Sequence, residues 1–555
     1  MTKLFIAIST ALCLFACAQQ VTHTVKDDDL ALAKVQVAQI QSHMEFLASD
    51  LLEGRETGTR GHELAALYIA GEFAKYGLVP AGDNSQYFQR INFRKALLEQ
   101  DSPSFFVQGD KEAFSFSYPN DFIMSPSVEH AHAQVSAALV FVGYGIVAPE
   151  YEQDDYQNLD VTNKIVVVLA GKPESMNTEA GAHLGSSSQK MHYAAERGAV
   201  GMIRIQTPES EKRRPYQRSL NYIHSPRMRW VDEQGKASNT FPSIKASAYM
   251  KLEAATKMFE QAGQDLAEIY AQIEKKQSPR GFPLALTVSL SAKSAHTSFT
   301  SPNVIGMIEG SDPTLKHEYV IYTAHADHIG IAKSVKKDKI NNGAMDNASG
   351  TAVLMETARV ISQMPLAPKR SILFIALTGE EKGLLGADYF AKQPTVPKSA
   401  MVANVNLDMP ILTYEFADVI AFGAEHSNMK ASVELAAQQA GVKLSPDPWP
   451  EQNLFTRSDH YSFVKQGVPA VFLVPGLQSK DPNIDGSAVF SNFLQSHYHL
   501  PSDDMSQDFV WQAAETFTKV NMQIGLTLAN QANRPYWNKD SFFGNTFGSK
   551  ETTQP

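Results

Sequence analysis

The sequence predicts an α/β fold, in which a mostly parallel mixed sheet is flanked by helices and interrupted by a β-rich insertion. Strand and helix patterns alternate from about residue 284 onward, which is typical of such a sheet. Between residues 135 and 283, short β-rich runs are instead separated by loops rich in Asp, Asn and Tyr. The 555 residues exceed one ordinary core, so we expect two domains or one domain with an insertion.

The N-terminal residues have the composition of an export signal. Lys3 precedes an apolar stretch, residues 4–16, that is too short for a transmembrane helix. Cys17 follows a small residue, as at the end of a bacterial lipoprotein signal, and Phe15 is larger than the residue usual there. We predict a signal peptide at residues 1–16, a lipid anchor on Cys17 and a polar tether over residues 17–30.

Cys13 and Cys17 are the only cysteines in the chain. Cleavage before Cys17 leaves one, so a disulfide framework is excluded. Stability must then come from the core and from bound metal. We expect an exported protein of the bacterial cell envelope that meets the membrane only through Cys17; the alternative is a secreted protein with an incidental cysteine.

The overall charge argues against a nucleic-acid partner. The formal net charge is −10 at pH 7, and phosphate backbones are bound by basic surfaces. A hydrophobic content of 43% with 19% charged residues indicates a globular chain rather than a disordered one.

Residues 31–134 form the first part of the main domain. A helix is predicted over residues 40–51, where apolar side chains recur at helical spacing, namely Ile40, Met44, Leu47 and Leu51. A second helix is predicted over residues 62–76, because Gly77 and Pro80 follow it in the order that ends helices.

Residues 135–283 form the predicted insertion. Strands are expected at residues 138–142 and 165–169, and a helix end that leads into a buried strand at residues 194–203. We find no catalytic cluster in this segment, which favours a lid or docking module over a second enzyme.

Residues 284–540 form the second part of the main domain, and residues 541–555 a polar tail that we expect to be loose. Buried strands are predicted at residues 284–290, 319–322, 371–377, 402–407 and 470–474. The apolar positions around residues 354–361 predict an amphipathic helix between two of these strands.

Five side chains of metal-ligand type follow one another along this half of the chain: His325, Asp346, Glu381, Asp408 and His499. His325, Glu381 and Asp408 each follow a predicted strand, and parallel strands bring such ends to one rim. Two imidazoles and three carboxylates suit two Zn²⁺ ions per chain that share one bridging carboxylate. Glu380, beside Glu381, can act as a general base.

Taken singly, each residue has a simpler explanation. A lone histidine is more often a surface or core residue than a ligand. Glu380 and Glu381 could be carboxylates at a helix start, and Asp346 could be an N-cap. The ordered set favours the metal interpretation.

In this set the chain resembles the M28 family of zinc peptidases, over residues 30–135 and 284–540. The motifs that carry the resemblance are T-A-H-A-D-H, G-A-M-D-N-A-S-G, L-T-G-E-E-K-G, V-N-L-D-M and Y-H-L-P-S-D-D. The insertion resembles a protease-associated (PA) domain through G-Y-G-I-V-A-P-E-Y and A-A-E-R-G-A-V-G-M-I. The resemblance implies one zinc on His325 and Asp408, another on Glu381 and His499, a bridging Asp346, and Glu380 as the general base.

The same resemblance assigns supporting residues. The H-x-D pattern implies that the Asp327 carboxylate orients the His325 imidazole, and Asp503 has the analogous part near His499. Tyr498 stabilises the oxyanion in this interpretation; a purely structural aromatic is the alternative.

The resemblance also implies a cis peptide bond between Asp346 and Asn347. Three further residues lie near the motifs, and we assign none of them a direct metal contact: His328, Asp459 and His460.

The expected function is that of an aminopeptidase, which removes N-terminal residues from peptides through a metal-activated water. A carboxypeptidase related to glutamate carboxypeptidase II and a glutaminyl-cyclase-like enzyme use related architectures. A non-catalytic receptor, like the transferrin receptors, is the rival from another class. A serine hydrolase is disfavoured because no G-x-S-x-G turn is found. The preferred N-terminal residue and the oligomeric state do not follow from the sequence.

Overall fold

The computed structural model describes residues 32, 34–109, 112–176, 178–332, 335, 337–549 and 552–553. The predicted signal peptide, Cys17 and the tether lie outside the described residues. Among the helices within the described ranges, none is both long and apolar enough to cross a membrane.

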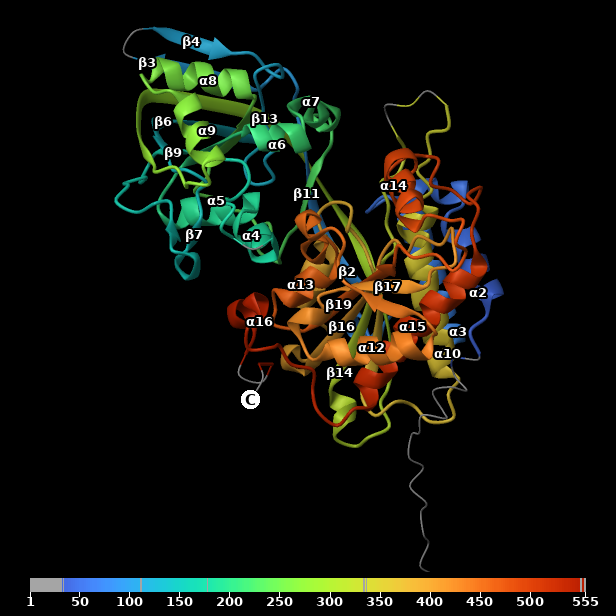
Figure 1. Cartoon of the computed structure of the whole chain (residues 1–555). Coiled ribbons are helices and arrows are strands. Elements are labelled where there is room, and N and C mark those ends of the chain that lie inside the picture. Colours follow the sequence, from blue (N-terminus) through green and yellow to red (C-terminus); the bar gives the residue numbers. More distant parts are fainter. Residues whose placement is uncertain are drawn as a thin grey trace, which may run out of the picture.

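The chain folds into two lobes that are joined by long strands (Figure 1). Strand β13 (Phe282–Ile308) runs through both lobes. Its first part pairs with β3 (Ser104–Gly109) and β6 (His132–Phe141) in the insertion lobe. Its last part pairs with β15 (Ser371–Leu377) in the main lobe. The insertion is therefore fixed to the main lobe by continuous sheet rather than by a flexible linker.

The main sheet confirms the predicted fold class. Its central strands are parallel to one another and follow the order β15, β14 (Tyr319–His325), β16 (Met401–Leu407) and β19 (Ala470–Pro475). Antiparallel strands flank them, with β13 on one side and β17 (Asp418–Phe422) on the other. Further strands complete this sheet: β1 (Val79–Pro80), β2 (Phe88–Leu98), β11 (Arg227–Trp230) and β18 (Lys443–Ser445).

Alternate side chains of the central strands pack on opposite faces of the sheet, which explains why these strands are apolar throughout. Tyr322 and Phe374 belong to one core, whereas Ile321 and Leu373 belong to another. The first core is covered by α2 (Val37–Leu47), α3 (Arg60–Lys75), α10 (Gly350–Ser362), α12 (Met429–Gln439), α14 (Gly486–Ser496) and α15 (Trp511–Asn530). The second core is covered by α11 (Leu385–Lys392) and α13 (His460–Val464).

The insertion lobe has a core of its own. Parallel strands β6, β9 (Ile165–Leu169), β10 (Gly201–Ile205) and β12 (Ala246–Met250) form its centre. The remaining elements of this lobe are β4 (Ala113–Phe116), β5 (Phe122–Ile123), β7 (Val147–Ala148), β8 (Gln153–Asp154), α4 (Thr178–Leu184), α5 (Ser187–Glu196), α6 (Pro208–Arg213), α7 (Tyr216–Ser219), α8 (Leu252–Gln261) and α9 (Leu266–Glu274). Helix α5 leads into strand β10, as predicted for residues 194–203.

The second core begins before residue 135, where we placed the boundary. Phe105, Phe116 and Phe122 are buried among the residues of the insertion lobe. The reason is that β3 pairs with the first part of β13, a contact between segments far apart in the sequence. The segment from about residue 104 therefore packs with the insertion rather than with the main lobe.

Two local expectations are corrected. The helix predicted over residues 40–51 ends at Leu47, because Ser49 caps a new 3₁₀ turn and accepts from the Leu51 amide; Leu51 is 83% exposed. The tail predicted to be loose instead contains α16 (Phe542–Phe547). Phe543 is fully buried in a small aromatic core, which explains why this polar segment is held in place.

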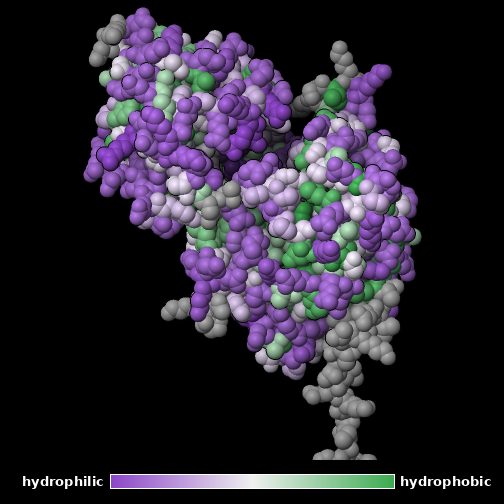
Figure 2. Space-filling view, viewed as in Figure 1, coloured by the Kyte–Doolittle hydropathy of each residue, from purple (hydrophilic) through white to green (hydrophobic). Residues whose placement is uncertain are grey.

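The surface between the lobes is hollowed. Figure 2 shows this hollow between the insertion lobe and the main lobe, bordered mainly by hydrophilic residues. Strand β11 lies at the junction of the two lobes in Figure 1.

Candidate metal centre

The candidate ligands meet where the parallel strands of the main sheet end. His325 is the last residue of β14, and Asp408 directly follows β16. Glu381 follows the end of the neighbouring strand β15. Because β14 lies between the other two strands, the three side chains come from adjacent strand ends, as the sequence predicted.

The first group of ligands is built around His325. Its Nε2 atom lies 3.1 Å from Asp408 Oδ1 and 3.3 Å from Asp346 Oδ1. His325 Nδ1 donates to the backbone carbonyl of Asp327 over 3.0 Å. This bond places a proton on Nδ1 and leaves the Nε2 lone pair facing the two carboxylates.

The second group uses the other oxygen of Asp346. His499 Nε2 lies 3.2 Å from Asp346 Oδ2 and 3.2 Å from Glu381 Oε2. Asp346 thus turns one carboxylate oxygen to each group. This is the arrangement expected of a carboxylate that bridges two cations.

His328 also enters the second group, although we had assigned it no metal contact. Its Nδ1 atom lies 2.8 Å from Glu381 Oε1 and 4.0 Å from Asp346 Oδ2. The ring is fully buried, and apart from this contact with Glu381 its nitrogens have no hydrogen-bond partner among the described residues. Both His328 and His499 are therefore placed to contribute an imidazole beside Glu381. In the sequence, the signal that could have indicated this contact is the second histidine of the A-H-A-D-H motif.

The donor set fits zinc in chemistry and in spacing. Zn²⁺ binds His nitrogen and carboxylate oxygen at about 2.0–2.2 Å, so two donors of a tetrahedral site lie about 3.3 Å apart. The separations from His325 and His499 to their carboxylates, 3.1–3.3 Å, agree with this value. His325, Asp346 and Asp408 lie close enough together to share one ion, as do His328, Asp346 and Glu381.

The electrostatics of the cluster favour positive charge at its centre. Although burial opposes it, Asp408 and Asp346 raise the pKa of His325 well above its usual range. Burial also opposes the shift at His499, but Glu381 and Asp346 raise the pKa of this imidazole to about 11. Four carboxylates, including Glu380, thus surround these imidazoles, and bound cations would replace the protons that the imidazoles otherwise hold.

Glu380 stands next to the ligand Glu381 at the turn after β15. Burial raises the pKa of its carboxyl well above the usual range, and Glu381, Asp408 and Asp459 add to the shift. Its backbone N–H donates to Asp327 Oδ1 over 3.1 Å. The environment therefore holds a carboxyl with high proton affinity beside the metal ligands, which suits a general base.

The two supporting aspartates act differently from what we expected. The Asp327 carboxylate accepts from Glu380 N–H and, over 2.9 Å, from the Thr57 hydroxyl; the His325 ring is oriented by the Asp327 backbone carbonyl instead. The Asp503 carboxylate accepts from the amides of Met345 and Asp346 over 2.9 and 3.0 Å. Each carboxylate therefore bonds to backbone amides near the candidate site residues. The Nδ1 atom of His325 already has a partner in the Asp327 carbonyl.

The loop that carries Asp346 is fixed by its neighbour. The peptide bond between Asp346 and Asn347 is cis, as expected. Asn347 Oδ1 accepts from the amides of Gly350 and Met409, and its Nδ2 donates to the carbonyl of Leu407. These bonds tie the bridging residue to the end of β16, beside Asp408.

Arg55 contacts the loops next to the cluster and was not predicted from the sequence to be a site residue. Its side chain is buried and donates to the carbonyls of Ala326 over 3.0 Å, Asn342 over 2.6 Å and Gly343 over 3.0 Å. Burial lowers its pKa to about 10, and the surrounding carboxylates, Asp327 first, oppose this shift. The guanidinium thus joins the two loops that carry His325 and Asp346.

Three other named residues lie around the centre. The Tyr498 ring stacks on His499, with 3.8 Å between the centroids. Asp459 is buried, and neither of its carboxylate oxygens has a hydrogen bond within the described ranges. His460 bonds to the carbonyl of Phe455 over 2.7 Å and belongs to none of the metal-ligand groups among the described residues. Ser458, which we had not named, bonds to Asp408 Oδ2 and accepts from Asn406 over 2.8 Å.

The backbone is strained at one candidate ligand and next to another. His499 has a φ of 59° and Met409, which follows Asp408, a φ of 44°. Non-glycine residues rarely adopt this left-handed conformation, at a cost of about 1–3 kcal/mol. The surrounding structure therefore holds both ligands in orientations that they would not adopt freely.

The fold and the cluster define a class: an α/β protein whose histidines and carboxylates gather into candidate metal sites at the carboxyl end of a mostly parallel sheet. The model of Peptidase family M28 matches residues 303–524, which hold every candidate ligand and Glu380. In residues 303–524 the chain is therefore similar to Peptidase family M28, a family of metal-dependent peptidases that includes aminopeptidases.

Curated relatives match parts of the chain. It is 29% identical over 235 residues to Aminopeptidase YwaD of Bacillus subtilis (strain 168), which is 40% of this chain and 45% of that protein. It is 33% identical over 142 residues to Aminopeptidase NAALADL1 of Mus musculus, 24% of this chain and 17% of that protein. The matches thus span less than half the length of these relatives.

The solved structure of an aminopeptidase from Aneurinibacillus sp. strain AM-1 shares the fold. Its TM-score is 0.52 at 18% identity, over 91% of this chain and 97% of that chain. At 18% identity this likeness shows a shared fold only. The shared fold extends beyond residues 303–524, the segment that the family model matches.

Proposed function

We propose that this protein is a two-zinc metallopeptidase, most specifically an aminopeptidase that removes N-terminal residues from peptides. The observation that carries the proposal is the placement of Asp346, whose two oxygens face two separate groups of imidazole and carboxylate donors. The curated relatives named as aminopeptidases support the same reaction class.

In this proposal, His325 and Asp408 hold one zinc, Glu381 and His499 hold the other, and Asp346 bridges the two. His328 lies close enough to Glu381 to replace or supplement His499 in the second position. When bound, zinc would polarise the scissile carbonyl and lower the pKa of a water molecule toward neutrality.

Glu380 serves as the general base of the proposed reaction. Its carboxylate accepts the proton of the attacking water and returns it to the amine that leaves. Asp327 fixes the backbone of Glu380 through the N–H bond described above. Tyr498, packed against His499, is placed to donate its hydroxyl proton as a hydrogen bond to the oxyanion.

The assignment of Glu380 is tested with Glu380→Gln, which keeps the size of the side chain but removes the titrating group. Loss of a general base typically lowers the rate about 10²–10⁴-fold, so kcat on an aminoacyl anilide should fall by at least about 100-fold. Metal analysis should show unchanged zinc content. The exposed Glu45→Gln serves as the control; a Glu380→Gln enzyme that turns over normally contradicts the assignment.

The direction of cleavage is tested with a panel of substrates. Aminoacyl anilides derived from Leu, Ala, Arg and Ser are compared with peptides that end in a C-terminal glutamate. Cleavage of the anilides alone supports an aminopeptidase, whereas release of the glutamate supports a carboxypeptidase. A zinc-loaded protein that cleaves neither would favour the receptor-like alternative.

The insertion lobe, which resembles a PA domain, is proposed to be a lid or docking module in this enzyme.

A further inference from the structure

A second cluster of metal-ligand type is separate from the candidate centre and lies where helix α4 of the insertion lobe meets the main lobe. His183 of α4 bonds through Nδ1 to the Tyr461 hydroxyl over 2.6 Å. The His183 ring also packs against Phe542 and Phe547 of α16. These contacts hold α4 at a fixed position on the main lobe, so the groups at its other end are also held there.

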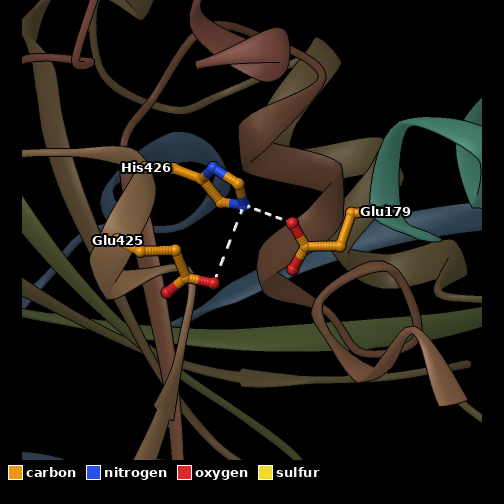
Figure 3. Close-up of side chains that lie close together, drawn as sticks. All are labelled: Glu179, Glu425 and His426. Atoms are coloured by element: carbon orange, nitrogen blue, oxygen red, sulfur yellow. Dashed lines mark hydrogen bonds and ion pairs between the residues drawn. The ribbon is translucent and has the colours of Figure 1, made fainter. Parts of the chain in front are cut away.

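Glu179 of α4 lies opposite Glu425 and His426 of the main lobe. Figure 3 shows the three side chains pointing toward one another across the junction of the lobes. His426 Nε2 lies 2.8 Å from Glu179 Oε2 and 3.9 Å from Glu425 Oε1. These values bracket the separation of about 3.3 Å between two donors of a tetrahedral zinc site, and all three donors lie within 4.8 Å of one another.

The imidazole is held in place by its surroundings. The turn η8 (Ala424–His426) follows β17 through Gly423, whose φ is 90°. The His426 ring packs against Phe455 and Phe543, with centroid distances of 5.0 and 5.1 Å. Only Nε2 faces the two carboxylates, so the ring offers one nitrogen in a defined direction.

The cluster carries an excess of negative charge. Among the described residues, no Lys or Arg forms an ion pair with Glu179 or Glu425. A single protonated imidazole leaves this group of carboxylates undercompensated, whereas a divalent cation would balance both glutamates.

We propose that Glu179, Glu425 and His426 bind a structural Zn²⁺ ion that joins the insertion lobe to the main lobe. Neutral imidazole and carboxylates are common ligands of zinc, and water would complete the coordination. The ion would be separate from the candidate metal centre and would act by fixing α4 against the main lobe. The proposal goes beyond the peptidase reaction and does not depend on it.

The proposal is tested by counting bound zinc. The chelator-stripped protein is dialysed to equilibrium against a fixed concentration of free Zn²⁺, and the metal is measured by mass spectrometry. Glu179→Gln and Glu425→Gln should each hold one equivalent less than the wild type. Glu434→Gln, an exposed carboxylate on α12, is the matched control and should hold as much as the wild type. Glu425 has a side chain that is 53% exposed, so its substitution leaves the packing of the lobes intact.

The outcomes separate this proposal from the peptidase proposal. Asp346→Ala should lose metal at the candidate centre yet retain the ion at the lobe junction. Equal zinc content in the wild type, Glu179→Gln and Glu425→Gln would overturn the junction site. Equal zinc content in the wild type and Asp346→Ala would instead overturn the two-zinc centre.

Discussion

At the scale of single residues, the buried cation Arg55 explains how loops from distant parts of the chain form one site. Its guanidinium donates to carbonyls on the loop after β14 and on the loop before Asp346. A buried carbonyl without a donor costs about 1–3 kcal/mol. The charge of Arg55 also lies among the carboxylates of the centre, which lowers their mutual repulsion.

Replacing Arg55 with methionine should therefore destabilise the protein strongly. The substitution leaves the carbonyls of Ala326, Asn342 and Gly343 without this donor, so we expect a loss of at least about 3 kcal/mol in the free energy of unfolding. Urea denaturation followed by circular dichroism measures the change. Arg60→Met, at an exposed position on α3, is the control and should change stability by less than about 0.5 kcal/mol. Matching denaturation midpoints for the two variants would contradict the role of Arg55.

The sequence predicted the ligand types because strand ends of a parallel sheet converge, a rule that needs no side-chain detail. It did not predict the contact of His328 with Glu381, since that contact depends on how the loop after β14 turns back. Arg55 and Thr57 were missed for a similar reason. Both come from the N-terminal part of the chain and reach the centre only through tertiary packing.

At the scale of elements, helices α2 and α3 are joined by a buried histidine. His43 Nδ1 lies 2.8 Å from the Tyr68 hydroxyl, and its Nε2 lies 3.0 Å from the Tyr76 hydroxyl. The sequence predicted both helices from their apolar spacing. It misplaced the end of the first one, because the cap formed by Ser49 overrides the apolar Leu51.

The His43 contact predicts a pH dependence of stability. Burial lowers the pKa of His43 from 6.5 to about 4, so the folded protein holds the ring neutral while the unfolded chain protonates it first. The stabilisation is thus complete above pH 6.5 and is lost as the pH falls toward 4.

This dependence is isolated with His43→Gln, which hydrogen-bonds but does not titrate in this range. The difference in unfolding free energy between the wild type and the variant should shrink as the pH is lowered from 6.5 to 4. Chemical denaturation at several pH values measures it. A difference that stays constant over that interval would show that folding does not lower the pKa of His43.

At the scale of the whole molecule, the two lobes share strand β13, so the insertion cannot move as a freely tethered domain. The short β-rich runs in the sequence indicated an insertion, but the predicted start at residue 135 was too late. Nothing in the composition around residue 104 marks the boundary, because β3 joins the second core through a partner far along the chain. Helix α16 was also not predicted, because its buried aromatic residues lie among polar residues in the sequence.

The predicted anchor concerns the whole protein and its location. We expect the wild-type protein, expressed in a bacterial host, to incorporate labelled palmitate and to sediment with membranes. Cys17→Ser should lose the label and become soluble after disruption of the cells, because no thiol remains for lipid attachment at that position. A wild-type protein that is released unlabelled into the medium would support the secreted alternative.

The central claim is that Asp346 bridges two cations. Crystals of the zinc-loaded protein, measured at the zinc absorption edge, test this claim most directly. The account predicts two anomalous peaks on opposite sides of the Asp346 carboxylate, one next to His325 and Asp408 and the other next to Glu381. A single peak, or no peak, beside Asp346 in fully loaded crystals would contradict it.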